Sequence, residues 1–391
     1  MSTFDPTPFD PTVFLPDDLI ERIRERAPIH DRENTFPQQD LDELRAAGYL
    51  SILVPTARGG AGLGLAEAAI LQQRLAGAAP ATALAINMHL VWTGVAKVFS
   101  DRGVPGLEFV QDGAVAGEVF AFGISEGGND LVLFGSDTAA VPDDDGGYAF
   151  TGTKIFTSLA PVWTRLGLHG LDTTSADAPK LVFAFVERTD AVATSDDWDT
   201  LGMRATQSRT TRLNGAIADA AHVVRRIDPG PSPDPIVFGI FSVFEILLAS
   251  VYTGIAGRAL ELAVATAQKR HSKKTGLAYS QDPDIRWRIA DMAIAYDALP
   301  PQIAALARDV DDRADKGARW FPLLSGVKHR AITMAKHVVD QAMLVAGGGS
   351  YFSANELSRL YRDVLAGAFH PSDPESAHST AASALLGPLE S

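Results

Sequence analysis

One acidic residue stands alone in a long apolar stretch of this sequence. Glu245 is the only charged residue in the segment PIVFGIFSVFEILLASVYTGIAG, residues 235–257. Burial of an unpaired carboxylate is costly and raises its pKa, so a lone acid in an apolar helix is a functional candidate. A carboxylate of this kind can act as a general base near neutral pH. The alternative is a structural acid that bonds to an arginine or to a backbone group of a helical bundle.

A second stretch has the small residues that a bound cofactor requires. The run GISEGGND, residues 123–130, combines three glycines with a serine. Glycines let backbone N–H groups approach a flat ring or a phosphate closely, and hydroxyls and carbonyls can bind the edge of a ring. The alternative is an ordinary turn at the end of a strand.

The composition excludes several other classes of function. The 391-residue chain is 46% hydrophobic, so it can form a sizeable core in two or three domains. A formal net charge of −14 argues against a nucleic-acid partner, which requires a basic face. The absence of cysteine excludes disulfides, thiol nucleophiles and thiolate metal sites, and we expect no metal. No signal peptide is visible, so we expect a cytoplasmic protein.

The apolar stretch at 235–257 is also long enough for a membrane span. It is a single candidate with a central carboxylate, and it lies in an acidic, otherwise polar protein. These features favour a buried core helix. We therefore expect no membrane span.

Three zones with different patterns must position these residues. Residues 1–118 have the three- and four-residue apolar spacing of helices, and residues 119–228 consist of short β-rich runs between Gly, Asp and Pro. After the proline-rich hinge DPGPSPDP, residues 236–391 return to a helical pattern. The long helical segments of this last zone are 237–272, 283–316, 322–348 and 354–368. The pattern predicts an α+β chain of three domains.

Six motifs in this order resemble those of the acyl-CoA dehydrogenase superfamily, and the resemblance covers nearly the whole chain. FPQQDLDELRAAGYLSILVPTARGGAGLGLAEAAI resembles the family's N-terminal helix and Gly-Gly loop, and AFGISEGGND resembles its flavin loop, shortened by two residues. GYAFTGTKIFTS and LGMRATQSRTTRL are similar to the next motifs, and IADM and GGGSYFSANELSRLYRD resemble two C-terminal landmarks. The resemblance implies a flavin-dependent oxidoreductase with an N-terminal helical domain, a middle β-domain and a C-terminal four-helix bundle.

The resemblance also implies which residues contact the flavin ring. The expected contacts are Phe122, Ile124, Ser125, Phe156, Thr157 and Ser158. Phe156 stands where the family usually has a tryptophan beside the isoalloxazine ring. For this residue, simple core packing is the alternative.

The far end of the flavin is expected to meet a second subunit. Arg270 resembles the arginine that binds the flavin pyrophosphate of a neighbouring subunit, since a guanidinium can bind two phosphate oxygens at once. Gly347 and Gly348 resemble the loop that receives the adenine end, although Leu344 replaces the family's glutamine nearby. We therefore expect FAD, with FMN or reduced flavin from a reductase as alternatives. Contacts across subunits predict a homodimer or homotetramer.

The family's usual catalytic base is missing. Many members carry a glutamate nine residues after the arginine of the RD motif, and counting from Arg362 that position is Pro371, preceded by His370. A second branch, typified by isovaleryl-CoA dehydrogenase, carries its glutamate on the helix where Glu245 lies, but at a position that corresponds to Phe244. An offset of one residue rotates a side chain by about 100° around the helix axis, so Glu245 does not match the position of that glutamate.

His370 instead resembles a histidine of the flavin monooxygenases built on this fold, such as dibenzothiophene monooxygenase. Those enzymes use reduced flavin and O2 and need no α-proton base. A histidine there can hydrogen-bond the oxygenated flavin and serve as a proton source. His89, in NMHLVW, could stand opposite His370. The alternative for either histidine is a satisfied core residue.

Three functions follow from these residues. The first is α,β-dehydrogenation of an acyl-CoA-type thioester, in which Glu245 takes the α-proton, the flavin takes the hydride, and an electron-transfer flavoprotein is a partner. The second is a two-component monooxygenase that receives reduced flavin from a flavin reductase and oxidises a small molecule. The third is a non-catalytic flavoprotein scaffold. The sequence favours the first narrowly, because most members of the family are dehydrogenases and Glu245 offers a base.

Overall fold

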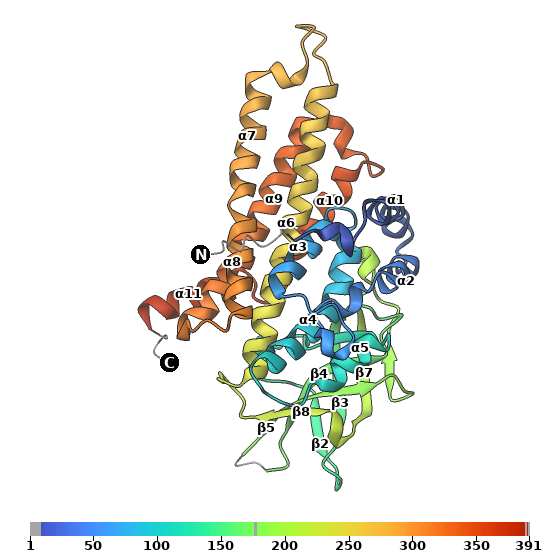
Figure 1. Ribbon diagram of the computed structural model, residues 1–391, viewed down its shortest axis with the longest axis vertical. Helices are drawn as coiled ribbons and strands as arrows, with labels where there is room; N and C mark the ends of the chain where they lie inside the picture. Colours follow the sequence, from blue (N-terminus) through green and yellow to red (C-terminus); the bar gives the residue numbers. More distant parts are fainter. Residues whose placement is uncertain (1–8, 176–177, 388, 390–391) are drawn as a thin grey trace, which may run out of the picture.

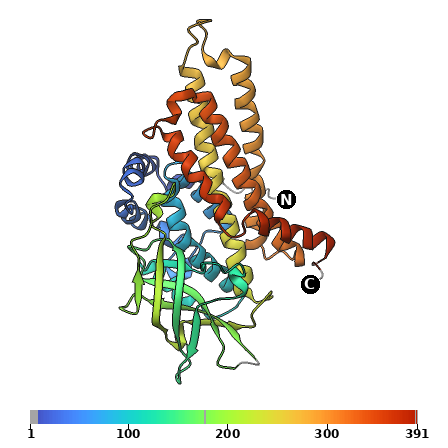
Figure 2. The same ribbon diagram turned by 180° about the vertical axis from the view of Figure 1, so that it is seen from behind.

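The chain passes from a group of helices through a β-sheet to a second group of long helices. The computed structural model describes residues 9–175, 178–387 and 389. Its element order confirms the predicted α+β class. The strands gather at one end of the molecule, and the long C-terminal helices extend to the other end (Figures 1 and 2). The three-domain boundaries stay a proposal, with helices changing to strands between residues 115 and 120 and back to helices between 227 and 235.

The first group of helices contributes much of the core. Its members are α1 (Asp17–Glu33), α2 (Gln38–Ala46), α3 (Leu65–Ala76), α4 (Pro80–Asp101) and α5 (Glu108–Val115). α4 begins at Pro80, because the fixed φ and missing N–H of proline suit the first helical position. Most of α4 is buried all round, so it is a core helix rather than an amphipathic surface helix.

The middle of the chain forms one mixed sheet. Its strands are β1 (Phe120–Gly123), β2 (Ala139–Pro142), β3 (Tyr148–Thr157), β4 (Arg165–Asp172), β5 (Lys180–Glu187), β6 (Val192–Thr194), β7 (Arg209–Ala218) and β8 (Val223–Ile227). They lie in the order β6-β7-β3-β2-β4-β5-β8, and β1 pairs in parallel with β4. Trp92 of α4 fixes the helix to this sheet. Its indole N–H donates to the Ala121 carbonyl at 2.9 Å, and its ring packs edge-on to Phe185 with centroids 4.6 Å apart.

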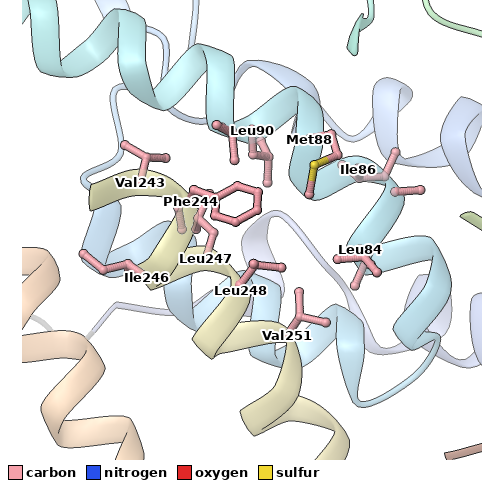
Figure 3. Close-up of a cluster of buried hydrophobic side chains, with 14 of the residues drawn as sticks. Leu84, Ile86, Met88, Leu90, Val243, Phe244, Ile246, Leu247, Leu248 and Val251 are labelled. Carbon is pink, nitrogen blue, oxygen red and sulfur yellow. The ribbon is translucent and has the colours of Figure 1, made fainter. Parts of the chain in front are cut away.

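The longest helix, α6 (Pro235–Lys269), is the centre of the second helical group. Asp234 caps its N-terminus by accepting the Ile236 N–H at 2.8 Å. It packs against α3, α4 and α9 (Trp320–Ala346). By length and composition α6 could cross a membrane, but 83% of its most apolar 18-residue window is buried inside the protein. Figure 3 shows its apolar side chains packed against those of α4.

The predicted single helix over 283–316 is wrong, because the structure has two helices there. α7 (Pro283–Asp297) ends before a pair of prolines, and α8 (Leu299–Asp311) begins with them near its N-terminus. Pro300 and Pro301 have no N–H groups with which to continue the hydrogen bonds of α7. They are tolerated in the first turn of α8, where those N–H groups would be unpaired in any case.

The C-terminal part of the chain folds back onto α6 and α9. α10 (Glu356–Leu365) ends in a short 3₁₀ turn, Ala366–Phe369, and α11 (Pro374–Leu386) follows after a gap of four residues. α11 lies beyond the helices that the sequence predicted. Asp373 caps its first turn by accepting the Ser376 N–H at 2.8 Å. We call residues 366–373 the C-terminal turn.

Candidate active site

A buried ion pair anchors the glycine-rich loop that follows β1. Glu126 of this loop and Lys154 of β3 are both buried, and the Lys154 Nζ lies 2.6 Å from the Glu126 Oε1. Glu126 also accepts hydrogen bonds from the Ser136 hydroxyl at 2.7 Å, the Asp137 N–H at 2.7 Å and the Thr138 hydroxyl at 2.6 Å. One carboxylate therefore ties the start of the loop to its end and to β3.

The two charges of this pair stabilise each other. Burial raises the pKa of Glu126, but the charge and hydrogen bond of Lys154 outweigh that effect and hold the pKa well below its usual range. Burial lowers the pKa of Lys154 to about 8, against the opposing charge of Glu126. Lys154 also donates to the His169 carbonyl at 2.7 Å, so its ammonium has partners on two sides.

The structure places the two groups of expected flavin-ring contacts side by side. The Ile155 N–H donates to the Ser125 carbonyl at 2.9 Å, which holds the end of β3 against the loop after β1. Phe156 has a left-handed φ of 55° and exposes 55% of its surface. Core packing would bury this ring. An exposed aromatic ring beside a glycine-rich loop is available to stack on a flat cofactor.

Polar atoms near Phe156 also fit a bound ring. The Thr157 Oγ1 is buried and has no hydrogen-bond partner among the described residues. Buried polar atoms are normally bonded, so this hydroxyl has a bond to spare for a ligand. The Ser158 hydroxyl bonds to that of Ser208 at 2.7 Å. Ile124 is buried, whereas Phe122 and Ser125 are partly exposed. These residues can line one face and the polar edge of a flavin.

An apolar wall lies beside Phe122. Its ring stacks on that of Phe244 from α6, with centroids 5.5 Å apart. Figure 3 shows Phe244 pointing towards Leu90 and Met88 of α4. The position at which the second branch of the family carries its glutamate is therefore filled by an aromatic ring.

His89 lies on α4 beside Phe120, and backbone groups bond to both of its ring nitrogens. The Phe120 N–H donates to Nδ1 at 3.2 Å, so the proton is on Nε2, which donates to the Leu50 carbonyl at 2.8 Å. Burial lowers the pKa of His89 to about 4. This geometry is that of a satisfied core histidine. In the described part of the chain, no cluster of three or more His, Asp or Glu side chains could hold a metal ion.

Glu245 faces the C-terminal turn. Its Oε1 accepts the Ser372 N–H at 2.9 Å and the Ser372 hydroxyl at 3.0 Å. Its Oε2 is buried without a hydrogen-bond partner in the residues that the structure describes. Burial raises the pKa of Glu245 to about 7, and the charge of Lys328 opposes this effect. The carboxylate is thus bonded to a backbone group, which was the alternative to a catalytic base.

Lys328 of α9 reaches the same turn from the other side. Its buried Nζ donates to the His370 carbonyl at 2.6 Å and to the Ser372 carbonyl at 2.5 Å. Burial lowers the pKa of Lys328 to about 8, against the charge of Glu245. An ammonium on two carbonyl oxygens and a carboxylate on an N–H therefore fix the backbone of residues 370–372.

His370 is the half-buried side chain that this arrangement holds. Its Nε2 lies 2.7 Å from the hydroxyl of Tyr252 on α6, and its Nδ1 has no partner among the described residues. Burial and the nearby Lys328 ammonium lower the pKa of His370 to about 3, so the ring is neutral. Glu245 and Tyr252 are seven residues apart, which puts both on the face of α6 that meets the C-terminal turn.

The residues expected at the far end of the cofactor lie together, but away from the sheet. The Arg270 guanidinium donates to the Ala346 carbonyl at 2.5 Å, directly before Gly347 and Gly348. Both Arg270 and Gly348 are exposed. They lie where α6 and α9 end, at the opposite end of the molecule from the strands (Figure 1). A single chain therefore does not bring these residues to Phe156.

Family patterns match both helical parts of the chain. The pattern described as "Acyl-CoA dehydrogenase, N-terminal domain" matches residues 18–100, and "Acyl-CoA dehydrogenase, C-terminal domain" matches residues 246–372. Together they cover more than half of the sequence.

The chain belongs to the acyl-CoA dehydrogenase superfamily. This superfamily is one of flavin-dependent enzymes, as the motifs implied. Several curated relatives match at least nine-tenths of the chain. They include the amino sugar nitrososynthase DnmZ of Streptomyces peucetius, which is 29% identical over 90% of this chain and 88% of its own. The putative acyl-CoA dehydrogenase YdbM of Bacillus subtilis is 26% identical over 94% of both chains. The dibenzothiophene monooxygenase of Rhodococcus qingshengii is 26% identical over 92% of this chain and 88% of its own.

A solved structure of the superfamily carries a flavin and a sugar nucleotide. The structure titled KijD3 in complex with FMN and dTDP-3-amino-2,3,6-trideoxy-4-keto-3-methyl-D-glucose superposes with a TM-score of 0.83 at 28% identity. The match covers 98% of this chain and 96% of that one. The relatives thus include dehydrogenases and oxygenating enzymes on one fold.

Sequence reasoning missed three residues of this candidate site. Tyr252, Lys328 and Ser372 hold the C-terminal turn, yet none stood out by residue type. Two signals were present. Tyr252 lies one heptad after Glu245. Of the four residues three and four positions away from Lys328, three are apolar: Leu324, Ala331 and Ile332.

Proposed function

We propose that this chain is a flavin-dependent monooxygenase that uses reduced flavin and O2 to oxidise the amine nitrogen of a small molecule. The observation that carries this proposal is the C-terminal turn. It offers a neutral histidine whose Nδ1 has no partner among the described residues, whereas the Glu245 carboxylate at the same turn is engaged by Ser372. Pro371 and Phe244 fill the two positions at which dehydrogenases of the superfamily carry their base. The nitrososynthases among the relatives favour nitrogen as the atom that is oxidised.

The bound reduced flavin, together with O2, would supply one oxygen atom for a new N–O bond, with the second oxygen leaving as water. The chain's own residues divide the remaining work. The apolar wall of Phe122 and Phe244 excludes water from one side of the site. The neutral His370 holds a proton beside the site without carrying a charge. Glu126 and Lys154 keep the flavin loop in place.

The same proposal covers the cofactor form, the partner and the assembly. We propose FMN rather than FAD, because Leu344 is an exposed aliphatic side chain at the place of the glutamine expected near the adenine. A separate flavin reductase would supply the reduced flavin. A homodimer or homotetramer would bring Arg270 to the FMN phosphate of a neighbour's site, and the loop at Gly348 would have no adenine to receive. A cytoplasmic location stays a prediction.

The first experiment measures hydrogen peroxide released per NADH consumed, with a flavin reductase, FMN, oxygen and a panel of amines. In the wild-type protein we expect an amine that lowers peroxide release and gains an oxygen atom. His370→Ala should raise peroxide release several-fold, because a reactive oxygen species without its proton donor decays to peroxide. His378→Ala is the matched control, since His378 is exposed on α11 and, within the described residues, hydrogen-bonds to the Pro374 carbonyl and not to the C-terminal turn.

A second candidate function is acyl-CoA dehydrogenation with Glu245 as the base. The observation in its favour is the unpaired Oε2 on a carboxyl group whose pKa is about 7. Loss of flavin absorbance on anaerobic mixing with an acyl-CoA, abolished in Glu245→Gln, would establish this function and contradict the first.

A further inference from the structure

We infer that Tyr252 determines which nitrogen of His370 carries the proton, so that Nδ1–H is the hydrogen-bond donor of the site. Tyr252 is therefore a positioning residue, which acts through His370. The catalytic consequence of this inference rests on the proposed function, whereas its structural content does not.

The argument begins with the bond between the two side chains. The Tyr252 hydroxyl lies 2.7 Å from the His370 Nε2, and Tyr252 is completely buried. A neutral imidazole has one N–H donor and one acceptor nitrogen, so one of two arrangements must hold. Either the phenol donates to Nε2 and Nδ1 carries the proton, or Nε2–H donates to the phenol oxygen.

The surroundings of Tyr252 decide between these arrangements. Among the described residues its hydroxyl has no polar partner other than His370. If Nε2–H donated, the phenol proton would be buried without an acceptor, which is unfavourable. If the phenol donates, its proton and the Nε2 lone pair are both satisfied. The remaining N–H is then on Nδ1, which has no partner among the described side chains and backbone groups.

The backbone around His370 keeps the ring in this relation to Tyr252. Lys328 binds the carbonyl of His370 itself, and Glu245 binds the N–H of Ser372 two residues later. The ring also packs against that of Tyr252 at a centroid distance of 5.8 Å. A flip of the ring about χ2 would put Cε1 in the place of Nε2 and break the bond to the Tyr252 hydroxyl, so it is unfavourable. The donor is thus set before any ligand binds.

The first test reads the tautomer directly in the flavin-free protein. Nitrogen-15 labelling of the histidines and long-range proton–nitrogen correlation spectra distinguish Nδ1–H from Nε2–H, and the His370→Ala spectrum identifies the signal. We expect Nδ1–H in the wild-type protein and a shift towards Nε2–H in Tyr252→Phe. Nε2–H in the wild-type protein, or an unchanged tautomer in Tyr252→Phe, would overturn the inference.

The second test measures peroxide release in the complete reaction mixture. We expect Tyr252→Phe to raise peroxide release per NADH at least several-fold, while it retains bound flavin. The control is Tyr49→Phe, because the buried Tyr49 hydroxyl bonds to Gln72 and not to the C-terminal turn. An equal rise in both variants would overturn the inference by showing general damage. A wild-type protein that oxidises no amine would contradict the proposed function, and the tautomer measurement would still decide the inference.

Discussion

At the scale of single residues, Glu245 has a clear structural role, although burying its ionised carboxylate costs free energy. Its carboxyl group is buried, and its pKa of about 7 lies above the ordinary value of 4.5. Between about pH 4.5 and 7, the Glu245 carboxyl group is therefore protonated in the folded protein and ionised in the unfolded chain. The contribution of this group to the free energy of unfolding falls as the pH rises through this window. The bonds to Ser372 are retained throughout, because either form of the carboxyl group can accept them.

Glu245→Gln should remove this part of the pH dependence. A glutamine keeps an acceptor for Ser372 but does not ionise. Relative to wild type, the free energy of unfolding of the variant should therefore increase between pH 5 and pH 8, by about 1–3 kcal/mol. Urea unfolding of both proteins at the two pH values measures the difference. An equal change with pH in the two proteins would show that Glu245 does not titrate in this window.

The buried ion pair of Glu126 and Lys154 should contribute more to the free energy of unfolding than an exposed ion pair does. Lys154→Met leaves Glu126 buried without its cation, and we expect it to cost about 3 kcal/mol of unfolding free energy. Flavin affinity should fall as well, because the loop loses its bond to β3. Lys180→Met is the matched control. Its pair with Asp228 is largely exposed and should contribute less than about 1 kcal/mol. Equal costs in the two variants would contradict the anchoring role.

The sequence identified residues of unusual type better than it identified their partners. Glu245 stood out because it is the only charge in its segment, and His370 because it adjoins a known motif position. Their partners could not be predicted, because Ser372 lies 127 residues from Glu245 and Tyr252 lies 118 residues from His370. Such contacts depend on how α6, α9 and the C-terminal turn pack, which local patterns do not encode.

At the scale of elements, α6 connects the two sides of the candidate site. One face carries Phe244 towards α4 and β1, and the adjacent face carries Glu245 and Tyr252 towards the C-terminal turn. This arrangement requires α6 to lie close to its neighbours. Gly254 permits one such approach, because a Cβ there would clash with the Gln73 carbonyl oxygen of α3.

Gly254→Ala should therefore destabilise the protein by at least about 2 kcal/mol, although alanine favours helices. Gly239→Ala, on the same helix, is the matched control. A Cβ at Gly239 would lie 3.2 Å from a Val95 methyl group, which is tight but involves a side chain rather than the backbone. We expect that variant to stay within about 1 kcal/mol of wild type in thermal or urea unfolding. A Gly254→Ala protein as stable as wild type would contradict the close approach.

The elements were predicted well where their patterns are long. The apolar stretch at 235–257 lies within α6, and the β-rich runs correspond to most strands of the sheet. β6 is only three residues long and has no pattern to detect. The break between α7 and α8 was visible in the sequence as Pro300 and Pro301, but the apolar spacing on both sides obscured it.

At the scale of the whole molecule, the expected cofactor contacts lie at opposite ends of one chain. Arg270 follows the C-terminal end of α6, and Ser125 follows β1. The end of α6 and the sheet lie at opposite ends of the molecule (Figure 1). If each flavin is bound between two subunits, defects at the two ends should complement each other. Arg270→Ala and Ser125→Trp should each bind little flavin alone.

Refolding an equal mixture of these two variants as a dimer should restore about a quarter of the wild-type flavin sites. Half of the dimers would be mixed, and each mixed dimer would have one intact site and one doubly defective site. Flavin bound per chain, measured after gel filtration, gives this fraction. No recovery in verified mixed dimers would show that each site is built within one chain.

The segment between α6 and α7, which we call the helical tip, also affects the association rate of the cofactor. Residues 269–288 carry six basic and two acidic side chains, in a chain whose formal net charge is −14. Lys273 and Lys274 are both exposed at this tip. Since the Debye length is about 10 Å at 0.1 M salt, an approaching phosphate responds to the tip more than to the distant acidic surface. Added salt should therefore lower the association rate of FMN and leave that of uncharged riboflavin almost unchanged. A protein whose net charge repels anions can thus still attract an anionic cofactor at one end.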